Sequence, residues 1–284
     1  MLQTIIGLDH VVILVRDLEH AAQAWRALGF TLSPRGTHSA NMGTGNYTIM
    51  FGDDYLELLG VLEPTPANAA MRDYLRAREG IERAAFTTLD AQAGADALRA
   101  RGVAATGPMD FGRPVDLPGG GSTRASFRTF NWPDDAHPGG LRLFACQHLT
   151  REAVWIPQLQ QHRNGVQRIL RIEILAGDPR AAADQMAALT DQQAVQDPQG
   201  GWQVESGGRR AHFLFLDRAT LAARYPGVDL SLLVDDCAAS LVLQVPDAAQ
   251  AAQTLGTLAA ERQAHRVVAA PSKACGLILA LEQV

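Results

Sequence analysis

The chain has 284 residues, of which 47% are hydrophobic and 19% charged, and its formal net charge is −5. This composition predicts a globular protein with a substantial core and excludes a chain that is disordered through low complexity. The arginines are scattered and the single lysine is Lys273, so the sequence lacks the basic stripe of a nucleic-acid-binding protein. No stretch of it reaches the roughly 18 apolar residues of a membrane span.

Cysteine usage and the first residues indicate the compartment. Three cysteines lie far apart and form neither a CxxC pair nor a disulfide framework: Cys146, Cys237 and Cys275. The run MLQTIIGLDHVVILV is apolar but contains Asp9 and His10, without a basic n-region or a small-residue cleavage site. We therefore expect a cytoplasmic protein that binds neither a membrane nor nucleic acid.

The first predicted module has the order strand, helix, strand, strand, strand. The β-branched apolar run Leu8–Val15 predicts a buried strand. Asp17 is suited to cap a helix with one apolar stripe, and Gly29 follows its end. Three further strands are expected at about 30–33, 47–51 and 55–61.

The same order recurs three times along the chain. The repeats open with predicted strands at 81–88, 169–175 and 240–245, and each strand is followed by a predicted helix. In the last copy one strand is missing from the pattern. A period of roughly 70–90 residues is too long for a solenoid and suits a small α+β module.

Modules of this kind are expected to pair, because one module alone leaves a sheet face uncovered. We expect the first two modules to form a domain over 1–150 and the last two a domain over 167–284. The Gln- and His-rich stretch 151–166 is predicted to be the connector.

Two groups of residues in the first module resemble a known family. Leu8-Asp9-His10 with its β-branched run, and the closing segment Tyr55-Leu56-Glu57-Leu58-Leu59, resemble the vicinal-oxygen-chelate superfamily. His38 followed by Gly43-Thr44-Gly45-Asn46 is similar to its glyoxalase-like proteins. The resemblance covers module one closely, module two in outline and the others through their element order. It implies an α+β fold of four βαβββ modules, paired into two glyoxalase-like domains with cupped, mostly antiparallel sheets.

The resemblance also implies a divalent metal held by one ligand from the first strand of a module and one from its last. Here these positions are His10 and Glu57. Imidazole and carboxylate together suit Zn, Mn, Ni or Fe and leave positions open for a chelating substrate. The second module departs from the pattern, because Arg83 stands at the expected His position and Phe144 at the expected carboxylate.

Strand alternation offers replacements for the missing ligands. Phe144, Cys146 and His148 share one face, so His148 can complete a two-His, one-carboxylate site. The alternative is that His148 is only a polar residue at a strand end. His38 is the other candidate, as a ligand or catalytic group.

Substrate contacts are expected from four residues of the first two modules. Arg83 and Arg128 would hold an anion if they face the cup, and would be a solvated surface if they face outward. Asn46 is either structural or a hydrogen-bonding group for the substrate, and Cys146 shares the cup-facing positions.

Three functions are compatible with these residues. The first is a metal-dependent lyase or isomerase of the glyoxalase type acting on a small, oxygenated, anionic metabolite. The second is a metal-free binding protein of the bleomycin-resistance type, and the third is an iron-dependent dioxygenase. The C-terminal modules lack the first-strand His, which favours a structural or lid role. The expected partner is a small molecule, with a homodimer left open.

Overall fold

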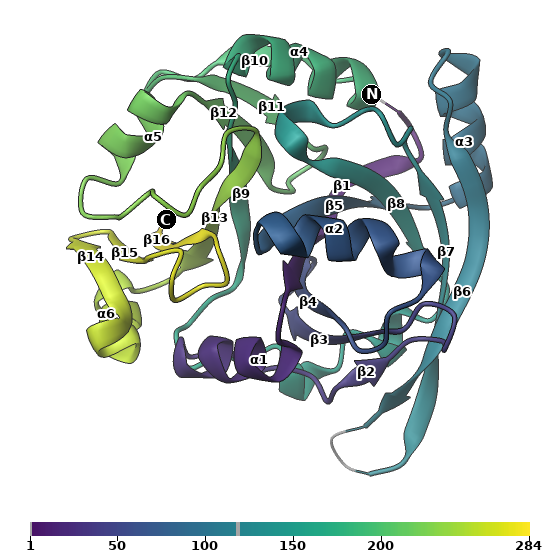
Figure 1. Ribbon diagram of the computed structural model, residues 1–284, viewed down its shortest axis with the longest axis horizontal. Coiled ribbons are helices and arrows are strands. Elements are labelled where there is room, and N and C mark those ends of the chain that lie inside the picture. Colours follow the sequence, from purple (N-terminus) through teal and green to yellow (C-terminus); the bar gives the residue numbers. More distant parts are fainter. Residues whose placement is uncertain (1, 118–119) are drawn as a thin grey trace.

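A computed structural model describes residues 2–117 and 120–284. It is a mixed α+β fold in which sixteen mostly antiparallel strands form one open sheet (Figure 1). Module one contains β1 (Ile5–Val15), α1 (Leu18–Ala27), β2 (Gly36–Thr37), β3 (Thr44–Met50) and β4 (Tyr55–Val61). After helix α2 (Ala69–Ala77), module two contains β5 (Gly80–Thr88), α3 (Ala91–Ala100), β6 (Thr106–Asp116), β7 (Ser122–Asn131) and β8 (Arg142–His148).

The second half of the chain repeats this order. Module three contains β9 (Arg168–Leu175), α4 (Pro179–Thr190), β10 (Ala194–Gln196), β11 (Trp202–Glu205) and β12 (His212–Leu216). After helix α5 (Arg218–Arg224), module four contains β13 (Cys237–Val245), α6 (Ala248–Leu255), β14 (Ala259–Gln263), β15 (Arg266–Ala269) and β16 (Ile278–Gln283). The predicted four βαβββ modules are confirmed.

Strand pairing follows one rule in all four modules. The first and last strands of a module are parallel, as in β1–β4 and β9–β12, and the first strands of paired modules are antiparallel, as in β1–β5 and β9–β13. The two halves join where β5 meets β13, through the pair Ile81 and Ala238. This arrangement fits a two-domain glyoxalase-like fold. The domain limits expected from the sequence, 1–150 and 167–284, stay a prediction.

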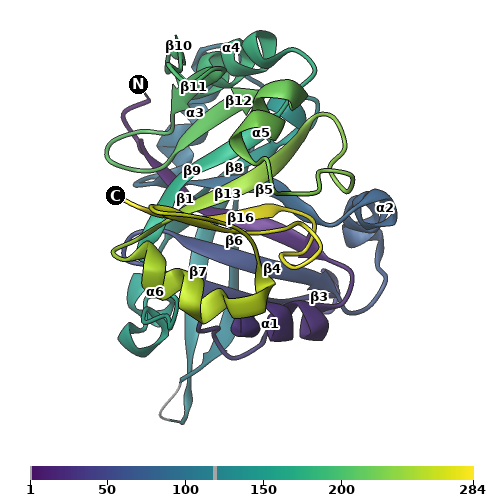
Figure 2. The ribbon, with the colours of Figure 1, turned by 90° about the vertical axis from the view of Figure 1, so that its left-hand side faces the viewer.

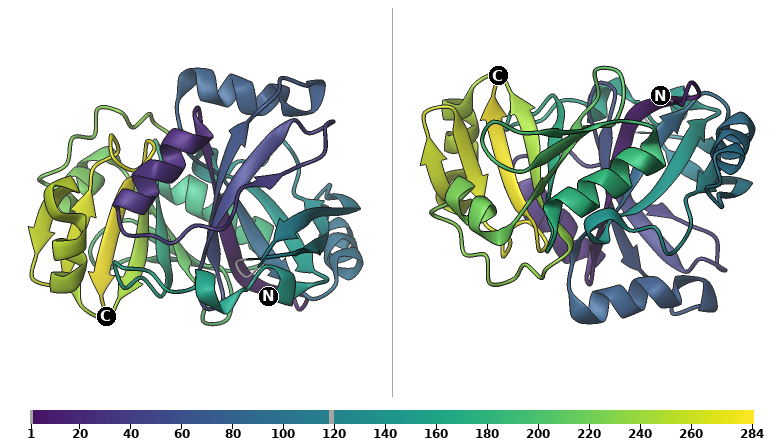
Figure 3. Two further views of the ribbon diagram at one scale, coloured as in Figure 1. Left: turned by 90° about the horizontal axis from the view of Figure 1, so that it is seen from below. Right: turned by 90° about the horizontal axis from the view of Figure 1, so that it is seen from above.

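The helix-covered sides of the two halves share one core. The largest apolar cluster contains residues of all four modules, and the rings of Phe86 and Phe213 lie 5.9 Å apart within it. Figures 1 and 2 show α1 and α6 at one end of the molecule and α3 and α4 at the other. Helix α2 stands apart from these, at the outer edge in both views of Figure 3. The opposite sheet faces form two cups.

The same residue type begins all four module helices. An aspartate in extended backbone precedes each, and its carboxylate accepts a hydrogen bond from a backbone N–H of the first turn: Asp17, Asp90, Asp178 and Asp247. This satisfies one of the N–H groups that a helix leaves without an internal partner. The helix positions were therefore predictable from the sequence.

Removal of one such cap gives a modest, testable loss of stability. Asp178→Ala is expected to lower the free energy of unfolding by about 1 kcal/mol, because Ala181 loses the side-chain acceptor for its N–H. Urea denaturation measures the change. Asp184→Ala, which breaks only an exposed ion pair with Arg180, is the matched control and is expected to cost less than about 0.5 kcal/mol.

Two strand predictions differ from the structure. Residues 30–33 form no strand. Phe30 packs its ring against Trp25, and Ser33 N donates a single backbone hydrogen bond to Thr48 O of β3. Pro34 then ends the pairing, because proline has no backbone N–H to donate. The strand missing from module four is β14, an edge strand that pairs only with β15 and is largely exposed. Its sequence therefore lacks an apolar alternation. No helix of the described residues is both long and apolar enough to cross a membrane.

Candidate functional site

The N-terminal cup is the sheet face formed by β1, β3, β4, β5 and β8 on the side away from α1 and α3. In β1 the register against β5 shifts between Leu8 and His10, which makes Asp9 an extra residue in the strand. Strict alternation would place Asp9 and His10 on opposite faces. The bulge instead allows their side chains to meet, with His10 Nδ1 2.7 Å from Asp9 Oδ1.

Asp9 is the hub of the buried part of the cup. It is 0% exposed and accepts hydrogen bonds from His10 Nδ1, from His148 Nε2 at 3.0 Å and from Thr87 Oγ1 at 2.6 Å. Burial by itself would raise the pKa of Asp9, but the charge of His148 and the hydrogen bonds from both histidines lower it below its usual range. Asp9 is therefore a buried carboxylate that stays ionised between two imidazoles.

His10 and Glu57 meet in the cup as expected from the sequence. His10 is 3% exposed, and its ring stacks on Tyr55 at 4.2 Å between centroids. The acceptor Asp9 assigns the ring proton to Nδ1, so Nε2 carries the lone pair and can accept only a long contact from the Tyr55 hydroxyl. That Nε2 lies 3.8 Å from Glu57 Oε2 and 3.5 Å from the Tyr55 hydroxyl.

Glu57 is held by Asn46 of the neighbouring strand β3. Asn46 is buried, and its Nδ2 donates to Glu57 Oε1 at 2.6 Å. The Oδ1 atom of Asn46 is buried without a hydrogen-bond partner. Asn46 therefore positions the carboxylate, which supports the structural alternative for this residue.

His148, expected as a third metal ligand, instead contacts Asp9, and its role as a ligand stays a prediction. Its Nε2 hydrogen-bonds to Asp9, and its Nδ1 is buried without a partner among the described residues. The ring is enclosed by Trp155 and Phe127, at 4.9 and 5.2 Å between centroids. Because the imidazole of His148 hydrogen-bonds to Asp9, His148 does not lie with His10 and Glu57 in one ligand set in this structure.

His38 lies outside the hydrogen-bonded group around Asp9. Its Nδ1 is 2.8 Å from the Thr44 hydroxyl, and burial lowers its pKa, with Glu57 opposing this shift. In the part of the chain that the structure describes, no group of three His, Cys, Asp or Glu side chains could hold a metal ion. A catalytic zinc takes three protein ligands. The two donors present, His10 and Glu57, do not fit the divalent metal that the resemblance implies.

Two of the expected substrate-binding residues face other partners. Arg128 is 42% exposed and forms hydrogen bonds of 2.5 and 2.9 Å with Asp110, while its neighbour Phe127 packs into the cup. Of the two alternatives for Arg128, this contact favours the solvated surface, and its role in substrate binding stays a prediction. The Arg83 guanidinium is paired with Glu82. Neither arginine is free to bind an anion in the cup.

Cys146 lies within the cup, as expected. It is buried in one apolar cluster with Met50 and Tyr55. Burial, reinforced by the charges of Asp9 and Glu57, raises the pKa of the Cys146 thiol well above its ordinary value. The thiol is therefore a space-filling group here and not a nucleophile.

The connector after β8 closes one end of the cup. Five of its residues pack on the cup-facing cluster: Ala153, Val154, Trp155, Ile156 and Leu159. His162 anchors it from both ring nitrogens, to Thr31 N at 3.1 Å and to Met50 O at 2.9 Å. This segment seals Asp9 and His148 from solvent.

A cavity of 140 Å³ is lined by residues of β2, β3, β6 and the connector. His10 and Glu57 are not in its wall, but Thr48 is, and Thr48 is the strand partner of Glu57. Sequence reasoning missed Arg113, a buried residue of β6 that also lines the cavity. Most residues of β6 are exposed, so the polar and apolar residues of this strand do not alternate in a way that indicates which side chains point inward. Other side chains of the wall come from Ser33, Thr37, Ile156 and Leu159.

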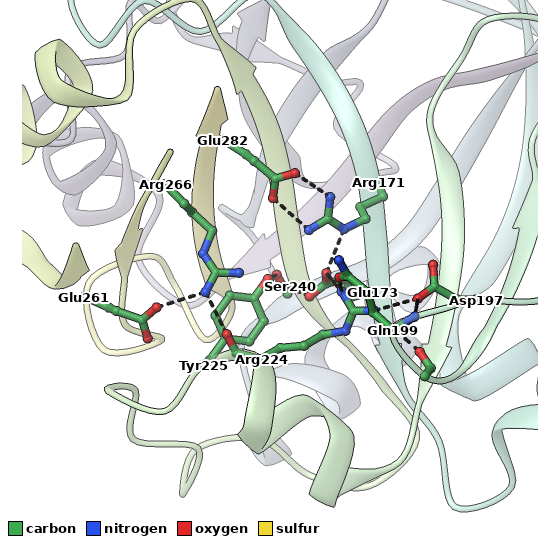
Figure 4. A network of polar contacts seen from close by, with 11 residues as sticks. Arg171, Glu173, Asp197, Gln199, Arg224, Tyr225, Ser240, Glu261, Arg266 and Glu282 are labelled. Atoms are coloured by element: carbon green, nitrogen blue, oxygen red, sulfur yellow. Dashed lines mark hydrogen bonds and ion pairs between the residues drawn. The ribbon is translucent and has the colours of Figure 1, made fainter. Parts of the chain in front are cut away.

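The C-terminal cup is filled by its own side chains (Figure 4). Arg171 forms two hydrogen bonds with Glu282, of 3.1 and 2.9 Å, and one of 2.8 Å with Glu173. The Tyr225 hydroxyl donates to Glu173 at 2.6 Å and lies 2.9 Å from the Ser240 hydroxyl. Where a first-strand His would stand, this cup thus holds an internal guanidinium between two carboxylates.

Fold and site together define a member of the vicinal-oxygen-chelate superfamily. The model of the glyoxalase-like domain family matches residues 8–190, and the chain belongs to this family. No curated protein matches the sequence significantly.

Three solved structures that match the chain differ in how much of it they cover. A hypothetical protein from Staphylococcus aureus has a TM-score of 0.69 at 12% identity and covers 98% of this chain and 99% of its own. A xylose isomerase-like TIM barrel/4-hydroxyphenylpyruvate dioxygenase fusion protein has a TM-score of 0.55 at 14% identity, covering 98% of this chain and 48% of its own. Methylmalonyl-CoA epimerase from Mycobacterium tuberculosis has a TM-score of 0.38 at 21% identity, covering 50% and 87%.

Proposed function

We propose that the protein catalyses an isomerase-type proton transfer on a small, oxygenated, anionic metabolite in the N-terminal cup, with His10 as the base. One observation carries this proposal. The hydrogen bond from His10 Nδ1 to the buried carboxylate of Asp9 leaves the lone pair on Nε2, 3.5 Å from the Tyr55 hydroxyl and 3.8 Å from Glu57. A histidine fixed in one tautomer by a carboxylate is a recurring general base.

The reaction breaks a C–H bond next to a carbonyl group. The proton moves to His10 Nε2, and the bonding electrons form an enolate on the substrate. Asp9 stabilises the imidazolium, which is the role of a buried carboxylate beside a catalytic histidine. Return of the proton to another position or face completes the isomerisation, so that no oxidant or reductant is needed.

Tyr55 is placed to support the enolate oxygen. Burial, followed by the charge of Asp9, raises the pKa of Tyr55 well above its ordinary value. Its hydroxyl therefore keeps its proton, and it lies 3.5 Å from the His10 Nε2 that would take the substrate proton. A preorganised donor at this position stabilises developing negative charge.

A second candidate is a metal-free protein that sequesters a ligand in the same cup. The two-donor set of His10 and Glu57 favours it over the metal-dependent lyase and over the iron-dependent dioxygenase. Both candidates bind an anion, but only the isomerase moves a proton.

Exchange with solvent distinguishes the two candidates. In D₂O, pyruvate and 2-oxobutyrate are expected to lose their C3 proton signals in the ¹H NMR spectrum faster with the protein than in buffer alone. Loss of signal reports removal of the proton next to the carbonyl, whatever the natural product is. Binding of both acids without faster exchange would favour the sequestering protein and contradict the isomerase.

A further inference from the structure

Arg113 is a buried arginine without a carboxylate partner. It is 8% exposed, and no Asp or Glu oxygen within the described residues lies within 4.0 Å of its guanidinium. Its one hydrogen bond goes from Nη1 to Pro114 O at 3.5 Å, which is at the limit of a useful contact. Three other arginines with side chains at most 13% exposed each have a carboxylate within 2.9 Å: Arg171, Arg224 and Arg266.

A largely buried charge without an opposite charge is unfavourable, so an anion that reaches this guanidinium would be stabilised. The 140 Å³ cavity provides the space, because Arg113 forms part of its wall together with the hydroxyl-bearing residues Ser33, Thr37 and Thr48. Two further charges line the cavity at exposed positions. Arg35 is paired with Glu19 at 3.2 Å, and Asp116 is exposed to solvent. Arg113 is therefore the buried charge of the cavity wall.

Arg113 is linked to the proposed base through a close backbone approach. A Cβ atom on Gly36 would lie 3.0 Å from Arg113 Nη1 and 2.2 Å from Asn46 Oδ1. Only glycine permits this approach of β2 to both side chains. Arg113 thus sits beside the amide that holds Glu57, which puts an anion bound there next to the His10–Glu57 pair.

We propose that Arg113 binds the carboxylate group of a small organic acid in this cavity. The guanidinium fork matches a carboxylate in two parallel hydrogen bonds. A cavity of 140 Å³ is close to the size of one of about 150 Å³ that binds benzene, which suits an acid of a few carbon atoms. This binding site deepens the proposed function: the identity of the acid as a substrate rests on the proposed isomerase reaction. Measuring binding without turnover tests the role of Arg113 alone.

The experiment is a calorimetric titration of the full chain with pyruvate as the probe. Arg113→Gln is expected to weaken pyruvate binding about 10- to 100-fold, because a charge-assisted bidentate contact is lost. Arg128→Gln is the matched control, since Arg128 lies on the adjoining strand of the same hairpin and points outward, and it should bind as the wild type does.

A second readout separates binding from a structural role. Without ligand, Arg113→Gln should unfold at the same temperature as the wild type or higher, because it removes an unpaired buried charge. Pyruvate should raise the Tm of the wild type and of His10→Asn but leave that of Arg113→Gln unchanged.

Unchanged pyruvate affinity in Arg113→Gln, or binding of inorganic phosphate but not pyruvate by the wild type, would overturn the proposal. A lower Tm of ligand-free Arg113→Gln than of the wild type would also overturn it, because that result would show that Arg113 stabilises the fold. Binding that depends on Arg113, without any proton exchange, would leave this site standing and contradict the isomerase.

Discussion

Replacing His10 with Asn is expected to lower the rate of C3 proton exchange about 10²- to 10⁴-fold, the usual contribution of a general base. The amide of Asn can still donate to Asp9 in place of Nδ1, so the buried carboxylate keeps a partner. What the variant lacks is Nε2, the atom that faces Glu57. The exchange rate measured by ¹H NMR in D₂O therefore tests whether the lone pair of His10 Nε2 accepts the proton.

His20→Gln is the matched control, because His20 is an exposed histidine of helix α1. Its exchange rate should equal that of the wild type. Equal melting temperatures for the wild type and both variants would exclude a folding defect. If His10→Asn exchanges protons as fast as the wild type, His10 is not the base.

The largest effect on stability is expected from Arg171→Met, which should lower the free energy of unfolding by about 3–5 kcal/mol. The guanidinium is the shared partner of Glu173 and Glu282, and Glu173 is fully buried. Its removal leaves Glu282 without its ion-pair partner and Glu173 with only the more distant guanidinium of Arg224, 3.9 Å away. Urea denaturation at neutral pH measures the loss.

Two comparisons test this reading of the C-terminal cup. Arg128→Met breaks an exposed pair and should cost at most about 1 kcal/mol. The triple variant Arg171→Met, Glu173→Leu, Glu282→Leu should recover much of the stability, because apolar replacement of a whole buried ion cluster is often neutral. A loss of less than 1 kcal/mol in Arg171→Met would show that the cluster does not hold the cup together.

The same pair predicts a pH dependence with a definite sign. Burial would raise the pKa of Glu282, but the hydrogen bonds and charge of Arg171 lower it below its ordinary value of 4.5. The folded wild type therefore binds fewer protons there than the unfolded chain, and it loses stability as the pH falls through the lowered pKa. In Arg171→Met the defect should shrink on acidification, because protonation relieves the two carboxylates.

The module order was predictable from the sequence because each module repeats a local pattern. A β-branched strand followed by a capping aspartate, such as Asp17 or Asp178, needs no knowledge of distant contacts. The meeting of His10 and Glu57 was predictable for a similar reason. In β1–β4 pairing, Val12 is the partner of Glu57, two residues from His10, so both side chains share a face.

The rest of the site depends on features that alternation does not encode. Asp9 was missed because a bulge brings it to the face of its neighbour His10. His148 was proposed as a metal ligand because alternation places it on one face with Phe144 and Cys146, and alternation alone does not reveal its contact with Asp9. Arg113 was missed because its burial comes from β2 and the connector, which are distant in sequence from β6.

Proton exchange by metal-stripped protein tests the central claim most directly. Wild-type protein is dialysed against a chelator, its metal content is checked by elemental analysis, and its C3 exchange rate with pyruvate is measured in D₂O. We predict that the rate equals that of untreated protein and disappears in His10→Asn. A rate that vanishes on metal removal and returns with added Zn, Mn, Ni or Fe would contradict the account.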